Sequence, residues 1–273
     1  MKAAAASEDA AIQAVFERLA LSAGRVIMDV YRSDFSAEQK ADESPVTEAD
    51  RQSERVILEG LRAAFPHIAC VAEEECAAGE GPSDPGRSFF LVDPLDGTKE
   101  FVNRRGDFTV NIALVRDGVP EIGIVYAPAS GRFFAGRPGA AEALELSAEG
   151  EIVGRRRIAV REAAVPMTIV ASRSHRTPET DDFISRFEAA EIVSIGSSLK
   201  FCLLACGEAD LYPRFGPTME WDTAAGDAVL RAAGGMTSTL DGEPLRYGKR
   251  GGGRDFLNPH FMAVGDARAW PFL

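Results

Sequence analysis

The chain has 273 residues, 45% of them hydrophobic and 26% charged, which allows a sizeable core and argues against a disordered protein. Its 42 acidic and 30 basic residues give a net charge of −12, which argues against nucleic acids and anionic membrane surfaces as partners. No apolar run approaches the ~20 residues of a transmembrane helix, and acidic residues interrupt the alanine-rich start, so we expect neither a membrane span nor a signal peptide.

The first half of the chain reads as two helices followed by strands. The periodicity predicts helices at 8–31 and from about Asp50 to Pro66, buried strands at 68–72 and 89–92, and antiparallel strands at 108–115, 119–126 and around Phe133. The charged stretch 142–157 is expected to be a variable surface excursion.

After residue 165 the pattern changes to alternating strands and helices. It predicts strands at 168–171 and 192–195, a helix opened by Thr177-Pro178, a helix from Ser198 to Cys206, and a last helix from Trp221 to Gly234-Gly235. We therefore expect a mixed α and β fold of two subdomains. Residues 1–160 would form an α+β unit with an antiparallel sheet, and residues 161–273 an α/β unit.

Residues 93–98 read Asp-Pro-Leu-Asp-Gly-Thr directly after an apolar run. Pro94 fixes one backbone angle and Gly97 eases a turn, so we expect a tight bend. That bend would point Asp93 and Asp96 at one place, which is the minimum requirement for a Mg²⁺ site. Turn chemistry alone is the alternative, because Asp-Pro and Asp-Gly are common turn pairs.

Other acidic residues occur where strands end or helices begin. They are Glu73 to Glu75 after the strand at 68–72, Asp222 in the first turn of the last helix, and Asp50 near the start of the second helix. Taken singly, they are typical of a solvated loop, a helix N-cap, and a capping box with Thr47. Taken together they favour a shared metal site, since ligands gather at the carboxyl ends of strands.

With these motifs the chain resembles the magnesium-dependent, lithium-sensitive phosphatases of the inositol monophosphatase superfamily, which share Asp-Pro-x-Asp-Gly-Thr and Trp-Asp motifs. Within that superfamily it is similar to the bacterial 3'(2'),5'-bisphosphate nucleotidases. The likeness is carried by residues 91–101, 172–175, 196–202 and 211–218, and it extends from about Pro45 to residues 256–259. The resemblance implies a layered α/β/α/β/α sandwich of the inositol monophosphatase and sugar phosphatase type.

The resemblance also implies roles for the acidic residues. The metal ligands would be Glu73, Asp93, the carbonyl of Leu95, Asp96 and Asp222, which would hold two or three Mg²⁺ ions. Thr98, oriented by Asp50, would activate the attacking water, and Glu74 would orient a further water. The amides of Gly97 and Thr98 would bind phosphate oxygens at a helix start.

Basic residues would complete the substrate site. By resemblance Ser197 and Lys200, with His175 nearby, would contact a nucleotide phosphate, Arg214 would line the nucleoside side, and Asp222 would also contact substrate. Inositol monophosphatases commonly carry an acid where Arg214 stands, whereas a guanidinium suits a phosphate or a base. The alternatives are a snorkelling Arg214, a solvated Lys200 and a loop-capping His175.

These features predict Mg²⁺-dependent removal of the 3'-phosphate from adenosine 3',5'-bisphosphate, with the sulfated analogue as a further substrate and a role in sulfur assimilation. One alternative is a broader inositol or sugar phosphatase, and another is a non-catalytic, metal-dependent nucleotide sensor. The partner would be a small nucleotide rather than a nucleic acid, and the protein a monomer or homodimer. A cytoplasmic location is expected, with peripheral attachment at the inner membrane left open.

The four cysteines carry little information about chemistry. Cys70, Cys76, Cys202 and Cys206 are expected to be core thiols, and no Cys and His spacing suits a zinc site. Redox sensitivity of Cys70 or Cys76 is left open.

Overall fold

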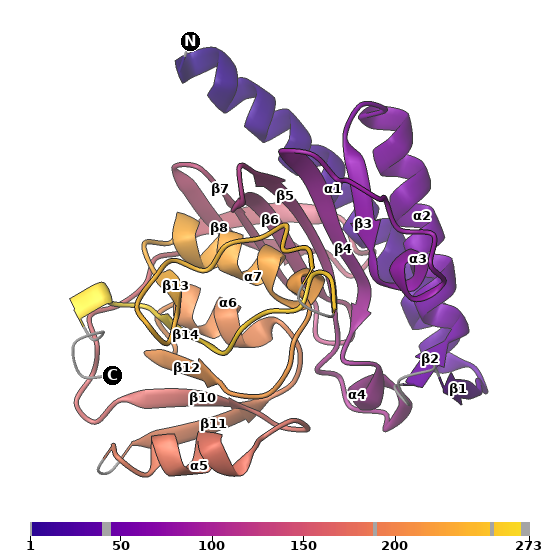
Figure 1. The fold of residues 1–273 in the computed structure, drawn as a ribbon. Coiled ribbons are helices and arrows are strands. Elements are labelled where there is room, and N and C mark those ends of the chain that lie inside the picture. Colours follow the sequence, from indigo (N-terminus) through magenta and orange to yellow (C-terminus); the bar gives the residue numbers. More distant parts are fainter. Residues whose placement is uncertain (1, 40–44, 188–189, 252–253, 269–273) are drawn as a thin grey trace.

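The computed structural model describes residues 2–39, 45–187, 190–251 and 254–268, which form five layers (Figure 1). Two long helices cover one face of a seven-stranded sheet, two central helices separate it from a five-stranded sheet, and one helix covers the outer face of the second sheet. In this order the helices are α1 (Lys2–Arg32) and α2 (Glu48–Ala64), then α6 (Leu199–Ala205) and α7 (Glu220–Ala232), and finally α5 (Pro178–Ile184). The predicted layered α/β/α/β/α fold is confirmed.

The seven-stranded sheet follows the chain in order from its first strand to its last. Its strands are β3 (Ala69–Ala72), β4 (Ser88–Asp96), β5 (Thr109–Arg116), β6 (Val119–Ala127), β7 (Arg132–Arg137), β8 (Ala140–Leu146) and β9 (Ile152–Arg157). All neighbours pair antiparallel except β3 and β4, which run parallel. Residues of β5 alternate between two cores, with Ile112 against the outer helices and Ala113 against the central layer, as the period of a strand requires.

The expected surface excursion at 142–157 is wrong, because these residues form β8 and β9 at one edge of this sheet. Leu144 is buried, and Arg155 of the edge strand forms ion pairs with Glu17 at 2.7 Å and with Glu142 at 3.2 Å. A strand at a sheet edge has only one covered side, so charged residues dilute its apolar alternation.

The second sheet has the strand order β11-β10-β12-β14-β13. Its strands are β10 (Thr168–Ser172), β11 (Glu191–Ile195), β12 (Leu211–Arg214), β13 (Met236–Thr239) and β14 (Phe261–Val264). Here β10 runs parallel to β11 and β12, as α/β alternation predicts, whereas β14 is antiparallel to its neighbours. Thr177 caps α5 through its side chain.

Helix α7 packs directly on the backbone of the first sheet, although it lies in the second half of the chain. A Cβ atom at Gly123 would lie 2.4 Å from the carbonyl oxygen of Ala225, and one at Gly136 would lie 2.5 Å from Cα of Val229. Glycine is therefore required where β6 and β7 pass under the helix. One core thus contains residues from both halves, and the division into subdomains at residue 160 stays a prediction.

Short elements complete the fold near one end of the sheets. They are β1 (Ala37–Gln39), β2 (Pro45–Thr47), α3 (Glu73–Ala77) and α4 (Thr98–Val102). Within the described ranges, none of the helices is both long and apolar enough to span a membrane.

Candidate active site

A cavity of about 690 Å³ opens where the end of β4 meets the starts of α4, α6 and α7. The predicted site residues in its lining are Glu73, Asp93, Leu95, Asp96, Gly97, Thr98, His175, Ser197, Lys200, Arg214 and Asp222. Asp50 and Glu74 are not among the described residues that line it. Six separate parts of the chain, from Glu73 to Asp222, therefore converge on one site.

The Asp93 to Thr98 motif differs from the tight bend that we expected. Strand β4 continues to Asp96, and its ladder with β5 is irregular between Asp93 and Asp96. Pro94 has no amide hydrogen for the ladder, so an irregular position is where a strand tolerates it. The chain turns at Gly97, whose φ of 94° favours glycine, and α4 begins at Thr98.

Asp50 is held in place from two sides. Its Oδ2 accepts hydrogen bonds from the amide and the hydroxyl of Thr47, both at 2.7 Å, so the capping box at the start of α2 is confirmed. Its Oδ1 lies 3.1 Å from Oγ1 of Thr98, which is also 3.2 Å from the carbonyl oxygen of Leu95. One carboxylate thus both caps a helix and reaches a hydroxyl that lines the cavity.

Asp96 and Asp222 are brought together around Ser198. The Oγ of Ser198 is 3.0 Å from Oδ2 of Asp96 and 2.5 Å from the carbonyl oxygen of Asp222, and it accepts a hydrogen bond from Asn111 Nδ2 at 2.9 Å. Burial raises the pKa of Asp96, and it raises the pKa of Asp222 well above the usual range, with repulsion from neighbouring carboxylates such as Glu73 adding to both shifts. We call this side of the cavity, which Glu73, Asp93, Asp96 and Asp222 line, the acidic wall, and its charges favour a bound cation.

Glu54 supports the acidic wall indirectly, by holding the start of α3. It is buried on α2, and its two carboxylate oxygens accept hydrogen bonds from the amides of Glu74 at 2.8 Å and Glu75 at 2.9 Å. These contacts fix the first turn of α3, which carries Glu73 to the cavity. Burial raises the pKa of Glu54 to about 8.

Another part of the lining carries a buried ammonium group, which is close enough to Asp96 to oppose the rise in the pKa of that carboxyl. Lys200 on α6 is only 4% exposed, and its Nζ donates to the carbonyl oxygen of Ser197 and lies 5.4 Å from the ring centre of Tyr212. Burial lowers the pKa of Lys200 to about 8. The Oγ of Ser197 is buried beside it and has no hydrogen-bond partner within the described part of the chain. An unsatisfied hydroxyl next to a buried cation suits an anionic oxygen ligand.

Arg214 and His175 also line the cavity, and together with Ser197 and Lys200 they form what we call the basic wall. The buried guanidinium of Arg214 donates to the carbonyl oxygens of Gly216 at 3.1 Å and Pro217 at 2.8 Å, so it is anchored rather than snorkelling. His175 lies at the exposed rim with its Nε2 3.2 Å from Nζ of Lys99. Desolvation, followed by repulsion from Lys99 and Arg214, lowers the pKa of His175 to about 4.

The acidic wall offers the donor atoms that a hard cation needs, but they are not yet gathered around one point. Carboxylate oxygens of Asp96 and Asp222 and the carbonyl of Leu95 face the same cavity as Glu73 and Asp93. In the described ranges, no set of three or more His, Cys, Asp or Glu side chains is already close enough to hold a metal ion. The donor chemistry fits Mg²⁺, and the individual ligand assignments stay predictions.

Comparison with known proteins identifies the family. A model of the inositol monophosphatase family matches residues 8–261. The chain belongs to this family. The resemblance that the motifs predicted is therefore confirmed.

Individual members of the family are also similar over most of the chain. The 3'(2'),5'-bisphosphate nucleotidase CysQ of Escherichia coli (strain K12) is 45% identical over 246 residues, which cover 89% of this chain and 96% of the relative. The protein of the same name from Salmonella typhimurium is 46% identical over 249 residues, with coverage of 90% and 97%. The crystal structure of CysQ from Bacteroides thetaiotaomicron has a TM-score of 0.78 and 38% identity, and the match covers 93% of this chain and 97% of that one.

Three residues in or near the site of this family member were given no role by the sequence analysis. Ser198 and Asn111 hold Asp96, and Glu54 holds α3. Ser198 lies inside the motif at 196–202, so it could have been found. Glu54 was also detectable, because it is a charged residue at helical spacing on the apolar face of α2. Asn111 lies inside an apolar strand, and its partner is 87 residues away.

Proposed function

We propose that this family member hydrolyses the 3'-phosphate of adenosine 3',5'-bisphosphate, giving AMP and phosphate. The observation that carries the proposal is the pairing of two walls in one cavity. One wall joins buried carboxylates to the Thr98 and Asp50 pair, and the other presents Lys200 and Arg214. Relatives that are named 3'(2'),5'-bisphosphate nucleotidase align over about nine tenths of the chain and support the same substrate.

Thr98 and Asp50 would prepare a water molecule for attack on phosphorus. A hydroxyl has one hydrogen, so Thr98 can donate either to Asp50 or to the carbonyl of Leu95, but not to both. When it donates to Asp50, lone pairs of Oγ1 remain to accept a hydrogen bond from water. The proton of the water would then pass through Thr98 toward the carboxylate of Asp50, which the Thr47 amide and hydroxyl hold in place.

Enzymes of this family depend on metal ions, typically Mg²⁺. Glu73, Asp93, Asp96, Asp222 and the carbonyl of Leu95 would hold two or three such ions, and Glu74 would orient a water nearby. When bound, Mg²⁺ would lower the pKa of water and offset charge that develops on the phosphoryl oxygens. The protein's own contribution is to fix this part of the lining in advance, since Ser198 donates toward the Asp96 carboxylate and the backbone carbonyl of Asp222.

The basic wall would select a nucleotide. The amides of Gly97 and Thr98 would bind the phosphate that is cleaved, while Ser197, Lys200 and His175 would hold the second phosphate. The unsatisfied Oγ of Ser197 supports this assignment, because it would gain an acceptor or donor from the substrate. Arg214 would lie along the nucleoside, where its planar guanidinium can stack on a base or bind an oxygen.

The direct test compares phosphate release from adenosine 3',5'-bisphosphate, inositol 1-phosphate and fructose 1,6-bisphosphate at saturating Mg²⁺. We expect kcat/KM to be highest for the nucleotide. A preference for a sugar phosphate would leave the metal chemistry in place but exclude the proposed substrate. No release from any of the three would favour the nucleotide sensor.

Two variants separate catalysis from selection in the same assay. Asp93→Asn removes a charge from the acidic wall and should abolish hydrolysis of all three substrates, with a loss beyond the about 100-fold seen when only a supporting residue is changed. Lys200→Met should lower kcat/KM mainly for the nucleotide. Undiminished activity of Asp93→Asn would refute the metal assignment.

Several finer assignments stay predictions. They are the number of metal ions, the choice between monomer and homodimer, hydrolysis of the sulfated analogue, and the location in the cytoplasm or at the inner membrane. The four thiols are free, and burial raises the pKa of each of them. A buried thiol with a raised pKa is a poor nucleophile, which agrees with their expected role in the core.

A further inference from the structure

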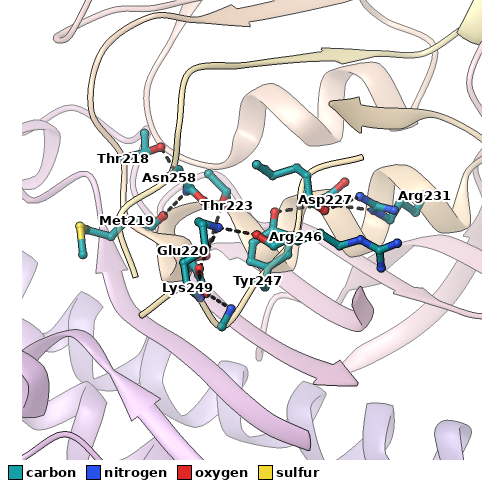
Figure 2. Close-up of polar contacts among 12 residues, drawn as sticks. Thr218, Met219, Glu220, Thr223, Asp227, Arg231, Arg246, Tyr247, Lys249 and Asn258 are labelled. Carbon is teal, nitrogen blue, oxygen red and sulfur yellow. Dashed lines mark hydrogen bonds and ion pairs between the residues drawn. The ribbon is translucent and has the colours of Figure 1, made fainter. Parts of the chain in front are cut away.

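Two stretches next to the cavity, residues 245–249 and 256–258, lie against the start of α7 (Figure 2). Apart from the single bridge between Leu257 and Met219, neither stretch is part of a helix or a strand. Backbone regularity therefore does not fix their position. Polar contacts with the first two turns of α7 help to do so, together with the burial of Leu245, Tyr247 and Phe256 in the core.

Glu220, the first residue of α7, anchors both stretches. Its carboxylate is fully buried and accepts hydrogen bonds from the amides of Gly248 at 2.6 Å and Lys249 at 2.8 Å, and it also forms an ion pair with Nζ of Lys249 at 2.8 Å (Figure 2). Its own amide donates to the carbonyl oxygen of Phe256 at 2.8 Å. Phe256 has a φ of 59°, a strained conformation for a bulky residue that persists only where surrounding contacts impose it.

Asn258 contacts residues on both sides of Asp222 in the chain. Its Nδ2 donates to the carbonyl oxygen of Met219 at 2.8 Å and lies 3.0 Å from Oγ1 of Thr223 and 3.2 Å from Oγ1 of Thr218 (Figure 2). Its backbone amide donates to the carbonyl oxygen of Thr218 at 2.9 Å. The Met219 carbonyl can only accept, so the amide group of Asn258 cannot be rotated by 180° without placing two oxygens against each other. Asn258 thus fixes the positions of Thr218 and Met219, which precede the first residue of α7.

Met219, whose carbonyl oxygen Asn258 contacts, also contacts the carboxylate of Asp222. The amide of Met219 donates to Oδ2 of Asp222 at 2.7 Å and completes a capping box at the start of α7. Asn258 binds the carbonyl of Met219, and Asp222 binds its amide. A displacement of residue 219 would therefore rotate the carboxylate of Asp222 and move its second oxygen, Oδ1, in the cavity.

We propose that Asn258 is a positioning residue for metal binding, which acts by fixing Met219 and so the orientation of the Asp222 carboxylate. The inference rests on the proposed role of Asp222 as a ligand. It assigns a role to Asn258, which lies in the 256–259 stretch where the family resemblance ends. A residue that orients a metal ligand typically contributes about 10- to 100-fold in affinity, so the effect should be measurable.

The test measures Mg²⁺ binding by calorimetry on the full chain without substrate, together with the melting temperature. Asn258→Ala removes the donors, and Asn258→Asp keeps the size but replaces the donor by an oxygen. Tyr247→Phe is the matched control, because it removes a buried hydrogen bond of 3.1 Å to Asp227 on the same helix without touching Met219. Asp222→Asn reports on the ligand itself.

We expect both Asn258 variants to weaken Mg²⁺ binding by about tenfold or more, and Tyr247→Phe to lower the melting temperature while leaving the affinity within twofold. If Asn258→Ala does not fold, Asn258→Asp decides the question. Equal loss of affinity in Tyr247→Phe would mean that Asn258 only stabilises α7, and unchanged affinity in both Asn258 variants would also overturn the inference. Unchanged affinity in Asp222→Asn would instead refute the proposed metal site.

Discussion

The acidic and basic walls of the cavity both hold charged side chains away from water, but the groups that surround these charges differ between the two walls. Asp96 and Asp222 are half-buried near other carboxylates, and desolvation, with repulsion from neighbours such as Glu73, raises the pKa of both groups. Arg214 on the other wall is buried against two carbonyl oxygens, and Lys200 donates to a third. Like charges meet on both walls, since Arg214 also lowers the pKa of Lys200 and His175, but the cations of the basic wall are in addition anchored by carbonyl oxygens of the fold.

This difference indicates a division of labour. A wall of buried like charges is costly until a cation binds, so it is suited to hold metal ions and reacting groups. A wall of cations anchored by carbonyls is preorganised and needs no rearrangement to receive an anion. We infer that the acidic wall governs the rate of the chemical step and the basic wall governs which phosphate ester enters.

The largest effect is expected for Asp50→Asn. The amide can no longer take a proton through Thr98, so kcat should fall by about 10²- to 10⁴-fold, the usual contribution of a positioned acid or base. The fall should be the same for nucleotide and sugar phosphates, since the reacting group is common to all. Glu48→Gln, at an exposed position in the same helical turn, is the control and should keep full activity. A loss confined to the nucleotide would place Asp50 in selection instead.

A smaller and substrate-dependent effect is expected for Arg214→Met. A hydrogen bond to a charged group contributes about 1.5–3 kcal/mol, so kcat/KM for adenosine 3',5'-bisphosphate should fall by about 10- to 150-fold. The value for inositol 1-phosphate should change by less than about threefold, because that substrate does not reach the nucleoside side. Equal losses for both substrates would show that Arg214 supports the site as a whole.

Local pattern predicted most of the fold and the acidic wall of the site, whereas the residues of the basic wall came from the family resemblance. Asp93 and Asp96 lie in the last part of the buried strand β4, and Asp50 and Asp222 each stand three residues after an N-cap, so short windows of sequence were enough to mark them. The spacing of apolar residues along the sequence also placed most of the predicted helices and strands within a few residues of their observed ends.

The errors arose where the deciding contact is distant in sequence. Strands β8 and β9 read as a surface excursion because Arg155 is matched by Glu17, which lies 138 residues away on α1. The expected bend at Pro94 is a continuation of β4, because pairing with Thr109 resumes at Asp96. Asn258 had no local signal either, since its partners lie 35 to 40 residues earlier.

The pH dependence of binding should report on Lys200. Burial lowers the pKa of this ammonium group to about 8, so its charge is present below that pH and is lost above it. For the free enzyme, kcat/KM for the nucleotide should therefore fall by up to about tenfold per pH unit above pH 8. Lys200→Met should lack this descending limb, and Lys99→Met, which changes an exposed lysine at the rim, should keep it. A limb that persists in Lys200→Met would assign it to another group.

The smallest effects concern stability, and here the two walls should respond with opposite signs. Asp96→Asn removes a buried like charge, so the metal-free protein should melt about 2–4 °C higher, as relief of about 1 kcal/mol implies for a chain of this size. Arg214→Met leaves the Gly216 and Pro217 carbonyls without their donor, so it should melt lower. Added Mg²⁺ should raise the melting temperature of the wild type more than that of Asp96→Asn, because a ligand that binds the folded state more tightly stabilises it more. Asp182→Asn, an exposed change on α5, should leave the melting temperature unchanged. If Asp96→Asn melts lower than the wild type in the absence of metal, the acidic wall is stabilised by its hydrogen bonds to Ser198 and Asn111 more than it is strained by repulsion, and the contrast between the walls fails.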